Sequence, residues 1–180
     1  MSGHNKWGQI KHQKGATDKK RGQLFSKILR AISIAAKTEP NPQFNPRLRS
    51  LLETAKANNV PNDNIERAIH KASEEKNLEE VIIEAYGPEG SQLIIEGITD
   101  NKNRTIAEVK YLLSEHNGKI ANPGSALWAF NAPTKEREIW ESKFPLAISD
   151  TAKTQLAALI EALADHDDIQ RVTTNVTSLL

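Results

Sequence analysis

The sequence predicts an α+β protein: an N-terminal basic arm and a small three-helix domain, followed by an α+β domain with a mixed or antiparallel sheet. Apolar residues recur at three- and four-residue steps up to about residue 77 and at two-residue steps after it. Charge also divides the chain, because residues 1–71 hold 14 Lys and Arg against 5 Asp and Glu, a balance of +9. Residues 72–180 hold the remaining 10 basic and 18 acidic residues, a balance of −8. We therefore expect two domains, 1–77 and 78–180.

Three amphipathic helices are expected in the first domain. The first begins near Asp18 and carries an apolar stripe, and cations at 27, 30 and 37 fall off that stripe and should face outward. Asn45 followed by Pro46 is typical of a helix start, since Pro costs least in the first turn. Asp63 and Glu66 have the spacing of a capping box and predict a third helix.

The second domain begins with a predicted hairpin. Residues 81–86 and 93–99 are apolar runs separated by a Gly-Pro-Glu-Gly turn at 87–90. A helix should follow, opened by a capping box of Thr105 and Glu108 and stopped by Gly118.

The rest of this domain is expected to add strands and one helix. Residues 125–130 predict a third strand with Trp128 and Phe130 on one face. The segment 131–148 is interpreted as a short connector with a short strand near 144–148. A helix capped by Asp150 and a closing strand over 169–176 complete the domain.

The N-terminal thirty residues carry eight Lys and Arg against one acid, Asp18, and are interrupted by glycines. Such a segment buries too little apolar surface to offset its own ordering entropy, so an external polyanion is the natural partner. A solvated basic tail is the alternative. Trp7 among cations is suited to stacking on bases, although packing onto the helical domain is nearly as well supported. The expected nucleic-acid contacts are Lys6, Trp7, Lys11, His12, Lys14, Lys19, Lys20, Arg21, Lys27, Arg30, Arg47 and Arg49.

Two smaller polar groups are candidate binding sites. Lys102 and Arg104 lie in a polar loop at a helix start and are a secondary anion contact, although a simple capped turn is slightly favoured. Acids at 165, 167 and 168 surround His166, but such a group is usually a solvated loop. No metal site and no cofactor are expected.

Catalytic patterns are not recognisable. The five histidines are scattered, and 15–22 lacks the Gly-Lys-Ser/Thr ending of a phosphate-binding loop. The absence of cysteine excludes disulfides and thiolate sites and suits a reducing cytoplasm. No run approaches the ~18 apolar residues of a membrane span. We expect a cytoplasmic protein without enzymatic activity or a membrane partner. The oligomeric state is open, with a monomer favoured.

Several motifs, in order and spacing, resemble the YebC family, which includes the mitochondrial translational activator of cytochrome oxidase. They cover nearly the whole chain and comprise Gly3-His4-Asn5-Lys6-Trp7, Lys20-Arg21-Gly22, Asn45-Pro46-Arg47-Leu48-Arg49, Asp63-Asn64-Ile65-Glu66-Arg67, Tyr86-Gly87-Pro88, Thr99-Asp100-Asn101, Gly124-Ser125 with Trp128 and Phe130, and Asp167-Asp168-Ile169-Gln170. Asn5 and Gln13 are mild departures from the family pattern. A larger departure is that 131–148 occupies the place of the family's extra α/β domain, which makes this a shortened member.

The resemblance implies a non-enzymatic, nucleic-acid-binding regulator of gene expression. Bacterial members are described both as DNA-binding transcriptional regulators and as ribosome-associated translation factors that help difficult sequences such as proline runs. An arm broken by glycines suits irregular rRNA or tRNA better than a DNA groove, so translation ranks first and promoter DNA second. A third alternative is a scaffold whose acidic second domain binds a basic protein.

Overall fold

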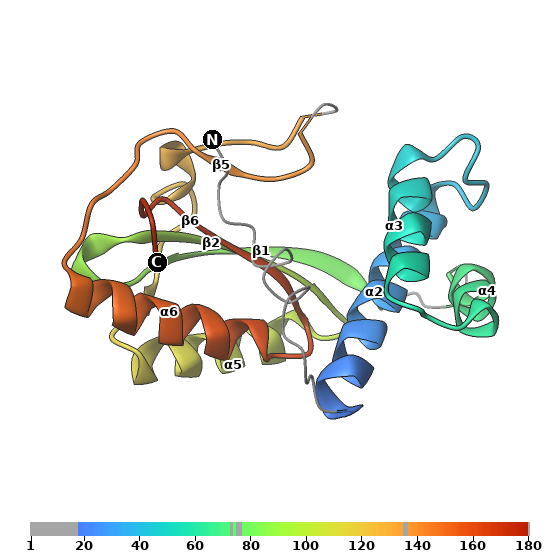
Figure 1. The fold of residues 1–180 in the computed structure, drawn as a ribbon, viewed down its shortest axis with the longest axis horizontal. Helices are drawn as coiled ribbons and strands as arrows, with labels where there is room; N and C mark the ends of the chain where they lie inside the picture. Colours follow the sequence, from blue (N-terminus) through green and yellow to red (C-terminus); the bar gives the residue numbers. More distant parts are fainter. Residues whose placement is uncertain (1–17, 73, 75–76, 135–136, 180) are drawn as a thin grey trace. The chain divides into compact units, whose positions relative to one another are not determined.

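The computed structural model describes residues 18–72, 74, 77–134 and 137–179 (Figure 1). Within these residues the chain divides into two compact units. The helical unit ends at Glu80 and includes Ile98–Asn101, and the α+β unit contains Val81–Gly97 and the residues from Lys102 onward. The predicted α+β class is confirmed, whereas the domain limits 1–77 and 78–180 remain predictions. None of the described helices is both long enough and apolar enough to span a membrane.

The described part of the helical unit contains α2 (Asp18–Thr38), α3 (Pro46–Ala57) and α4 (Asn62–Lys71). Helix α2 packs against both α3 and α4, so it buries a wide face rather than a single narrow stripe. The Ser33 hydroxyl donates to the carbonyl of Ala68 at 3.1 Å and adds a polar bond between α2 and α4. The buried apolar side chains of this unit include Ile28, Ile32, Ala35, Leu48, Ala55 and Ile65.

The start of α3 is the helix start that the sequence predicted. The Asn45 side-chain oxygen accepts the backbone N–H of Leu48 at 3.0 Å, and Pro46 occupies the first turn. The Asn45 amide group also donates to the carbonyls of Ala35 at 2.9 Å and Glu39 at 2.7 Å. One buried side chain therefore caps α3 and ties it to the end of α2.

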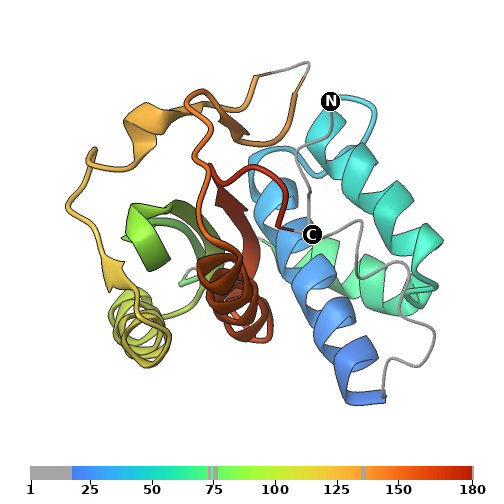
Figure 2. The same ribbon diagram turned by 60° about the vertical axis from the view of Figure 1, so that its left-hand side comes forward.

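The α+β unit is built on a sheet whose described strands are β1 (Glu79–Tyr86), β2 (Gln92–Thr99), β3 (Lys119–Ile120) and β6 (Ile169–Thr174). Their order is β3-β1-β2-β6, and β1 pairs with β3, and β2 with β6, in antiparallel fashion. Helices α5 (Lys102–Glu115) and α6 (Asp150–Ala164) cover one face (Figures 1 and 2). The core between them is apolar and includes Val81, Ile83, Leu93, Val109, Leu156 and Leu159.

The other face of this sheet is covered by irregular chain. The 3-10 helix η1 (Pro88–Gly90) contacts α6 and does not belong to this layer, which contains the 3-10 helix η2 (Leu127–Ala129) and the short antiparallel pair β4 (Phe130–Asn131) and β5 (Glu141–Ser142). Ile94, Ala126, Ala129 and Phe130 form a second apolar cluster here. Both faces of β2 are therefore buried, which explains its continuous apolar sequence.

The predicted strand over 125–130 is wrong. Only Phe130 enters a strand, and the preceding residues form η2 because the Glu84 carboxylate accepts the backbone N–H groups of Ala126 at 2.7 Å and Leu127 at 2.8 Å. Trp128 and Phe130 do not share a face: Trp128 is 57% exposed and Phe130 only 6%. The short strand expected near 144–148 is reduced to one parallel bridge, Leu146 with Val176.

Three predicted helix caps are also wrong. Helix α6 is capped by the Ser149 hydroxyl rather than by Asp150, and α4 begins after Pro61 without a side-chain cap. Helix α5 begins at Lys102, three residues before Thr105, whose hydroxyl bonds to Asp168 instead. Ser149 and Pro61 directly precede the helices α6 and α4, whereas the Thr105 hydroxyl of α5 bonds to a residue distant in sequence.

Gly118 ends α5 through close approach rather than through backbone freedom. Asn117 takes the left-handed conformation with φ 57°, and the Gly118 N–H donates to the carbonyl of Leu113 at 2.8 Å. A β-carbon on Gly118 would lie 2.9 Å from the carbonyl oxygen of Tyr86, closer than such atoms pack. The predicted stop is in the right place.

Turn η1 is bonded to the start of α6. The Glu89 carboxylate accepts the hydroxyl of Ser149 at 2.6 Å and its backbone N–H at 3.0 Å. These two bonds lower the pKa of Glu89 below its ordinary value, because both favour the charged carboxylate.

Candidate nucleic-acid interface

Part of the predicted interface precedes the described chain. Lys6, Trp7, Lys11, His12 and Lys14 lie outside the described residues, so their roles remain predictions. The described part of the interface begins at α2.

The first turns of α2 carry three consecutive exposed cations, Lys19, Lys20 and Arg21. Arg21 also lies over the ring of Phe25, with its guanidinium carbon 5.3 Å from the ring centroid. Cations are disfavoured near a helix N-terminus, where the aligned peptide dipoles already present positive charge. The helix dipole therefore does not explain the position of these three cations, and together they make a positively charged end suited to phosphate groups.

Lys27 and Arg30 follow on the same helix but differ in exposure from what the sequence pattern predicts. Lys27 is only 8% exposed, so the expectation that it faces outward is wrong. Arg30 is half-buried. The physical reason is that α2 packs against two helices, which widens its buried face to include positions outside the apolar stripe.

Arg47 and Arg49 are exposed on the first turns of α3. Arg47 forms an ion pair with Glu80, and both side chains stay about half exposed. The Arg49 guanidinium donates to the carbonyl of Gln43 at 3.5 Å. Both cations remain accessible, and we retain them as predicted phosphate contacts.

Phe44, which the sequence pattern did not single out, is 75% exposed immediately before the Asn45 cap. A hydrophobic residue at this position usually packs against the fourth helical residue, which here is the charged Arg49. That mismatch is the sequence signal for its exposure. Phe44 is therefore an exposed aromatic residue that precedes the exposed Arg47 and Arg49 in the sequence.

The predicted secondary anion contact lies at the start of α5. Lys102 is exposed, whereas a nitrogen of the Arg104 guanidinium lies 2.6 Å from an Asp168 oxygen. Asp168 is 2% exposed, and its carboxylate also accepts the hydroxyl of Thr105 at 2.7 Å. Arg104 thus has a structural partner, and this favours the simpler interpretation of the loop as a capped turn. Its role as an anion contact stays a prediction.

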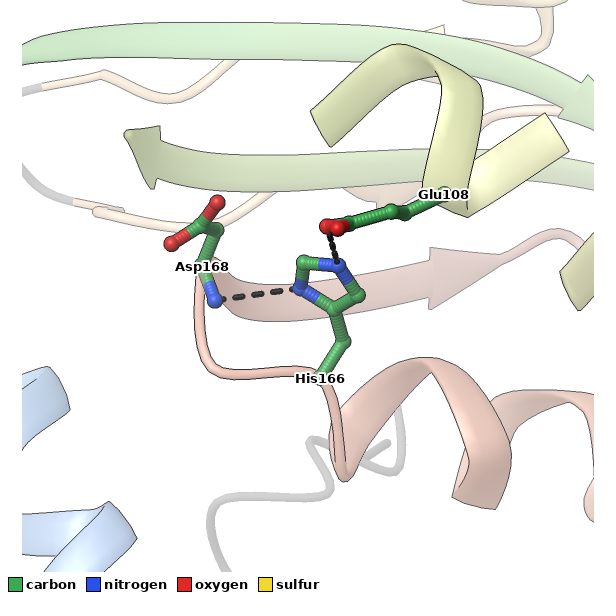
Figure 3. A group of neighbouring side chains, drawn as sticks. All are labelled: Glu108, His166 and Asp168. Carbon is green, nitrogen blue, oxygen red and sulfur yellow. Dashed lines mark hydrogen bonds and ion pairs between the residues drawn. The ribbon is translucent and has the colours of Figure 1, made fainter. Parts of the chain in front are cut away.

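Glu108, His166 and Asp168 form the group of described residues with the closest metal-like spacing (Figure 3). The Asp168 N–H donates to Nδ1 of His166 at 3.1 Å, which makes Nδ1 an acceptor and leaves Nε2 to donate to Glu108 at 2.8 Å. A metal ion at Nε2 would displace that proton, and at Asp168 it would compete with Arg104. The hydrogen bonds of this group therefore connect α5 to the segment just before β6. Glu108 was not predicted, since nothing local connects it to His166.

Two family models match this chain. A family model described as the TACO1/YebC protein N-terminal domain matches residues 5–75, and one described as the TACO1/YebC second and third domain matches residues 78–135. A probable transcriptional regulatory protein of Desulfosudis oleivorans is 42% identical over 183 aligned positions, which cover 99% of this chain and 73% of that protein. One from Chlorobium phaeobacteroides is 51% identical over 134 positions, covering 72% of this chain and 54% of that protein.

A solved structure shares the fold. The crystal structure of the conserved hypothetical protein Aq1575 from Aquifex aeolicus superposes with a TM-score of 0.85 and 30% identity, covering 95% of this chain and 96% of that one. The resemblance inferred from the motifs is confirmed by these matches. The chain therefore belongs to the TACO1/YebC family.

Proposed function

We propose that this protein is a non-enzymatic, nucleic-acid-binding regulator of gene expression that acts on RNA, as a ribosome-associated translation factor in the cytoplasm. The names of its relatives, probable transcriptional regulatory proteins, support the general class of regulator. The finer choice of RNA depends on the chain's own residues.

The observation that carries the proposal is the exposed triplet Lys19, Lys20 and Arg21 at the N-terminus of α2. These cations oppose the helix dipole, so stabilisation of the helix end does not explain their position. They continue a sequence in which Lys6, Lys11 and Lys14 precede them with no acid before Asp18. Six cations in this order suit a phosphate backbone, whose counterions they would release on binding.

RNA is favoured over a DNA groove by the distribution of these groups. The expected contacts lie on the arm and on two different helices, α2 and α3, rather than along one helix that could enter a major groove. Aromatic residues accompany the cations, Trp7 in the arm and the exposed Phe44 before α3. Stacking on unpaired bases is the usual use of such residues in RNA recognition.

The decisive test compares two triple variants that remove the same charge. We expect Lys19→Gln, Lys20→Gln and Arg21→Gln together to weaken RNA binding and to flatten its salt dependence by roughly 2 units in the log–log slope. The control changes Lys56, Arg67 and Lys71 to Gln, which are exposed cations of the same unit outside the predicted interface. Equal loss in both variants would contradict a specific interface. Absence of the wild-type protein from every ribosomal fraction of a polysome gradient would count against the translation role.

DNA binding is the second candidate, because the relatives carry the name of transcriptional regulators. It predicts protection of discrete promoter sites that survives at physiological salt. Footprinting on genomic promoter fragments distinguishes it from RNA binding. Discrete footprints together with no ribosome association would replace the first proposal with this one.

A further inference from the structure

The α+β unit exposes two large aromatic side chains next to each other. Trp128, in η2, is 57% exposed, and Phe144, after β5, is 48% exposed. Their ring centroids lie 5.4 Å apart with the planes tilted by 44°. Exposed aromatic pairs of this size are costly in water and commonly mark a binding surface.

The Trp128 ring is held in place by hydrogen bonds. Its Nε1 donates to the carbonyl of Ser125 at 2.8 Å, and the same carbonyl accepts the hydroxyl of Tyr86 at 2.8 Å. The loop before it is fixed by Glu84, a carboxylate only 7% exposed that accepts the backbone N–H groups of Gly124, Ala126 and Leu127. The indole is therefore oriented before any ligand arrives, which reduces the entropy lost on binding.

Phe144 is tied to the same loop and stands beside a cation. The backbone N–H groups of Lys143 and Phe144 both donate to the carbonyl of Ala129, at 2.8 and 3.3 Å. The Lys143 ammonium lies 5.3 Å from the centroid of the Phe144 ring. Glu141, two residues earlier, is engaged by Arg137 at 2.7 Å, so this acid does not offset the charge of Lys143.

We propose that Trp128 and Phe144 form a stacking platform for an unpaired base of single-stranded nucleic acid, with Lys143 contacting the adjoining phosphate. The inference rests on the proposed function and adds to it a contact in the acidic half of the chain. A nucleotide supplies both a flat base, which can stack on the two rings, and a nearby phosphate, which can contact the Lys143 ammonium. An apolar peptide would match the rings but leave Lys143 without a counter-charge.

The test measures binding of the full chain to 12-nucleotide oligouridine and oligothymidine by fluorescence anisotropy. Trp128→Ala and Phe144→Ala should each lower the affinity about tenfold, a typical effect of removing one base-stacking side chain. Trp128→Phe keeps a stacking face and should restore most of it. Tyr111→Ala is the matched control, since Tyr111 is 63% exposed on α5 of the same unit. Ultraviolet crosslinking should place the nucleotide on the peptides that carry Trp128 and Phe144.

The outcomes separate this platform from the proposed function. If the Lys19, Lys20 and Arg21 variant loses binding while both alanine variants bind as tightly as wild type, the platform is overturned and the proposed function stands. If the wild-type chain binds neither oligonucleotide but is found in ribosomal fractions, the platform is overturned and the proposed function stands; if it does neither, both fail. Wild-type oligonucleotide affinity in Trp128→Ala, combined with loss of that variant from ribosomal fractions, would identify a protein partner and overturn the platform. Unchanged thermal unfolding in the alanine variants excludes misfolding as the cause of a loss.

Discussion

The helical unit and the α+β unit use charged residues in opposite ways. In the helical unit, cations such as Lys19, Lys20 and Arg49 lie on the surface. In the α+β unit, the two carboxylates Glu84 and Asp168 are buried and accept hydrogen bonds from elements far away in sequence. Most cations of the first unit are exposed, Lys27 being an exception, whereas these two carboxylates are structural components of the second unit.

The difference shows why net charge alone is a poor guide to function within one chain. The α+β half is strongly acidic by composition, but its most constrained acids are internal and contribute to the fold. Burying a carboxylate is favourable only when donors satisfy it, and both acids meet that condition. We therefore expect that removing a buried acid lowers the free energy of unfolding, whereas removing a surface cation weakens nucleic-acid binding.

The largest stability effect is expected for Asp168→Ala. The change leaves the Arg104 guanidinium and the Thr105 hydroxyl without their shared partner at the start of α5. We expect a loss of about 2–3 kcal/mol in the free energy of unfolding, the range for hydrogen bonds to a buried charge. Urea denaturation, monitored by circular dichroism, measures this loss of stability. Glu115→Ala, at the exposed end of the same helix, should change stability by less than about 0.5 kcal/mol. Similar losses of stability in both variants would contradict the structural role of the buried Asp168.

A smaller effect is expected for Asn45→Ala, which tests how much a buried, uncharged polar side chain contributes to the stability of the helical unit. The variant removes the cap of α3 and the two amide bonds to the end of α2. A loss of about 1–2 kcal/mol follows from the usual value of an N-cap. The exposed Asn62, at the first position of α4, provides the control as Asn62→Ala. If Asn45→Ala left thermal unfolding unchanged, polar caps would not be what holds this unit.

The smallest effect concerns Glu89 and depends on pH. Its folded-state pKa is lowered by the two bonds from Ser149, so the charged carboxylate stabilises the fold above the ordinary pKa of 4.5. That contribution should disappear as pH falls through the lowered value. Glu89→Gln should therefore reduce the melting temperature slightly at pH 7, and the difference should shrink at the most acidic pH at which the protein stays folded, as the carboxylate becomes protonated below 4.5. A difference that is the same at both pH values would show that the charge is not involved.

Much of the secondary structure could be predicted because it depends on local patterns. The three-to-four-residue spacing around Ile28 and Ile32 identified α2, and Asn45 with Pro46 identified the start of α3. The segment 125–130 could not be predicted, because its conformation is set by Glu84, about forty residues earlier. The exposure of Lys27 was also missed, since it depends on how many helices pack against α2.

Composition and spacing by themselves determined the helices, the strands of the main hairpin and the basic N-terminal part, while the resemblance of several motifs to known proteins indicated the family. Only the tertiary structure decided which charges are buried, which aromatic rings face the solvent and how Glu108 meets His166. The physical reason is the distance along the chain over which each interaction acts. Periodicity and turn chemistry act over a few residues, whereas the burial of a carboxylate or the exposure of Trp128 depends on partners that the chain brings together only when it folds.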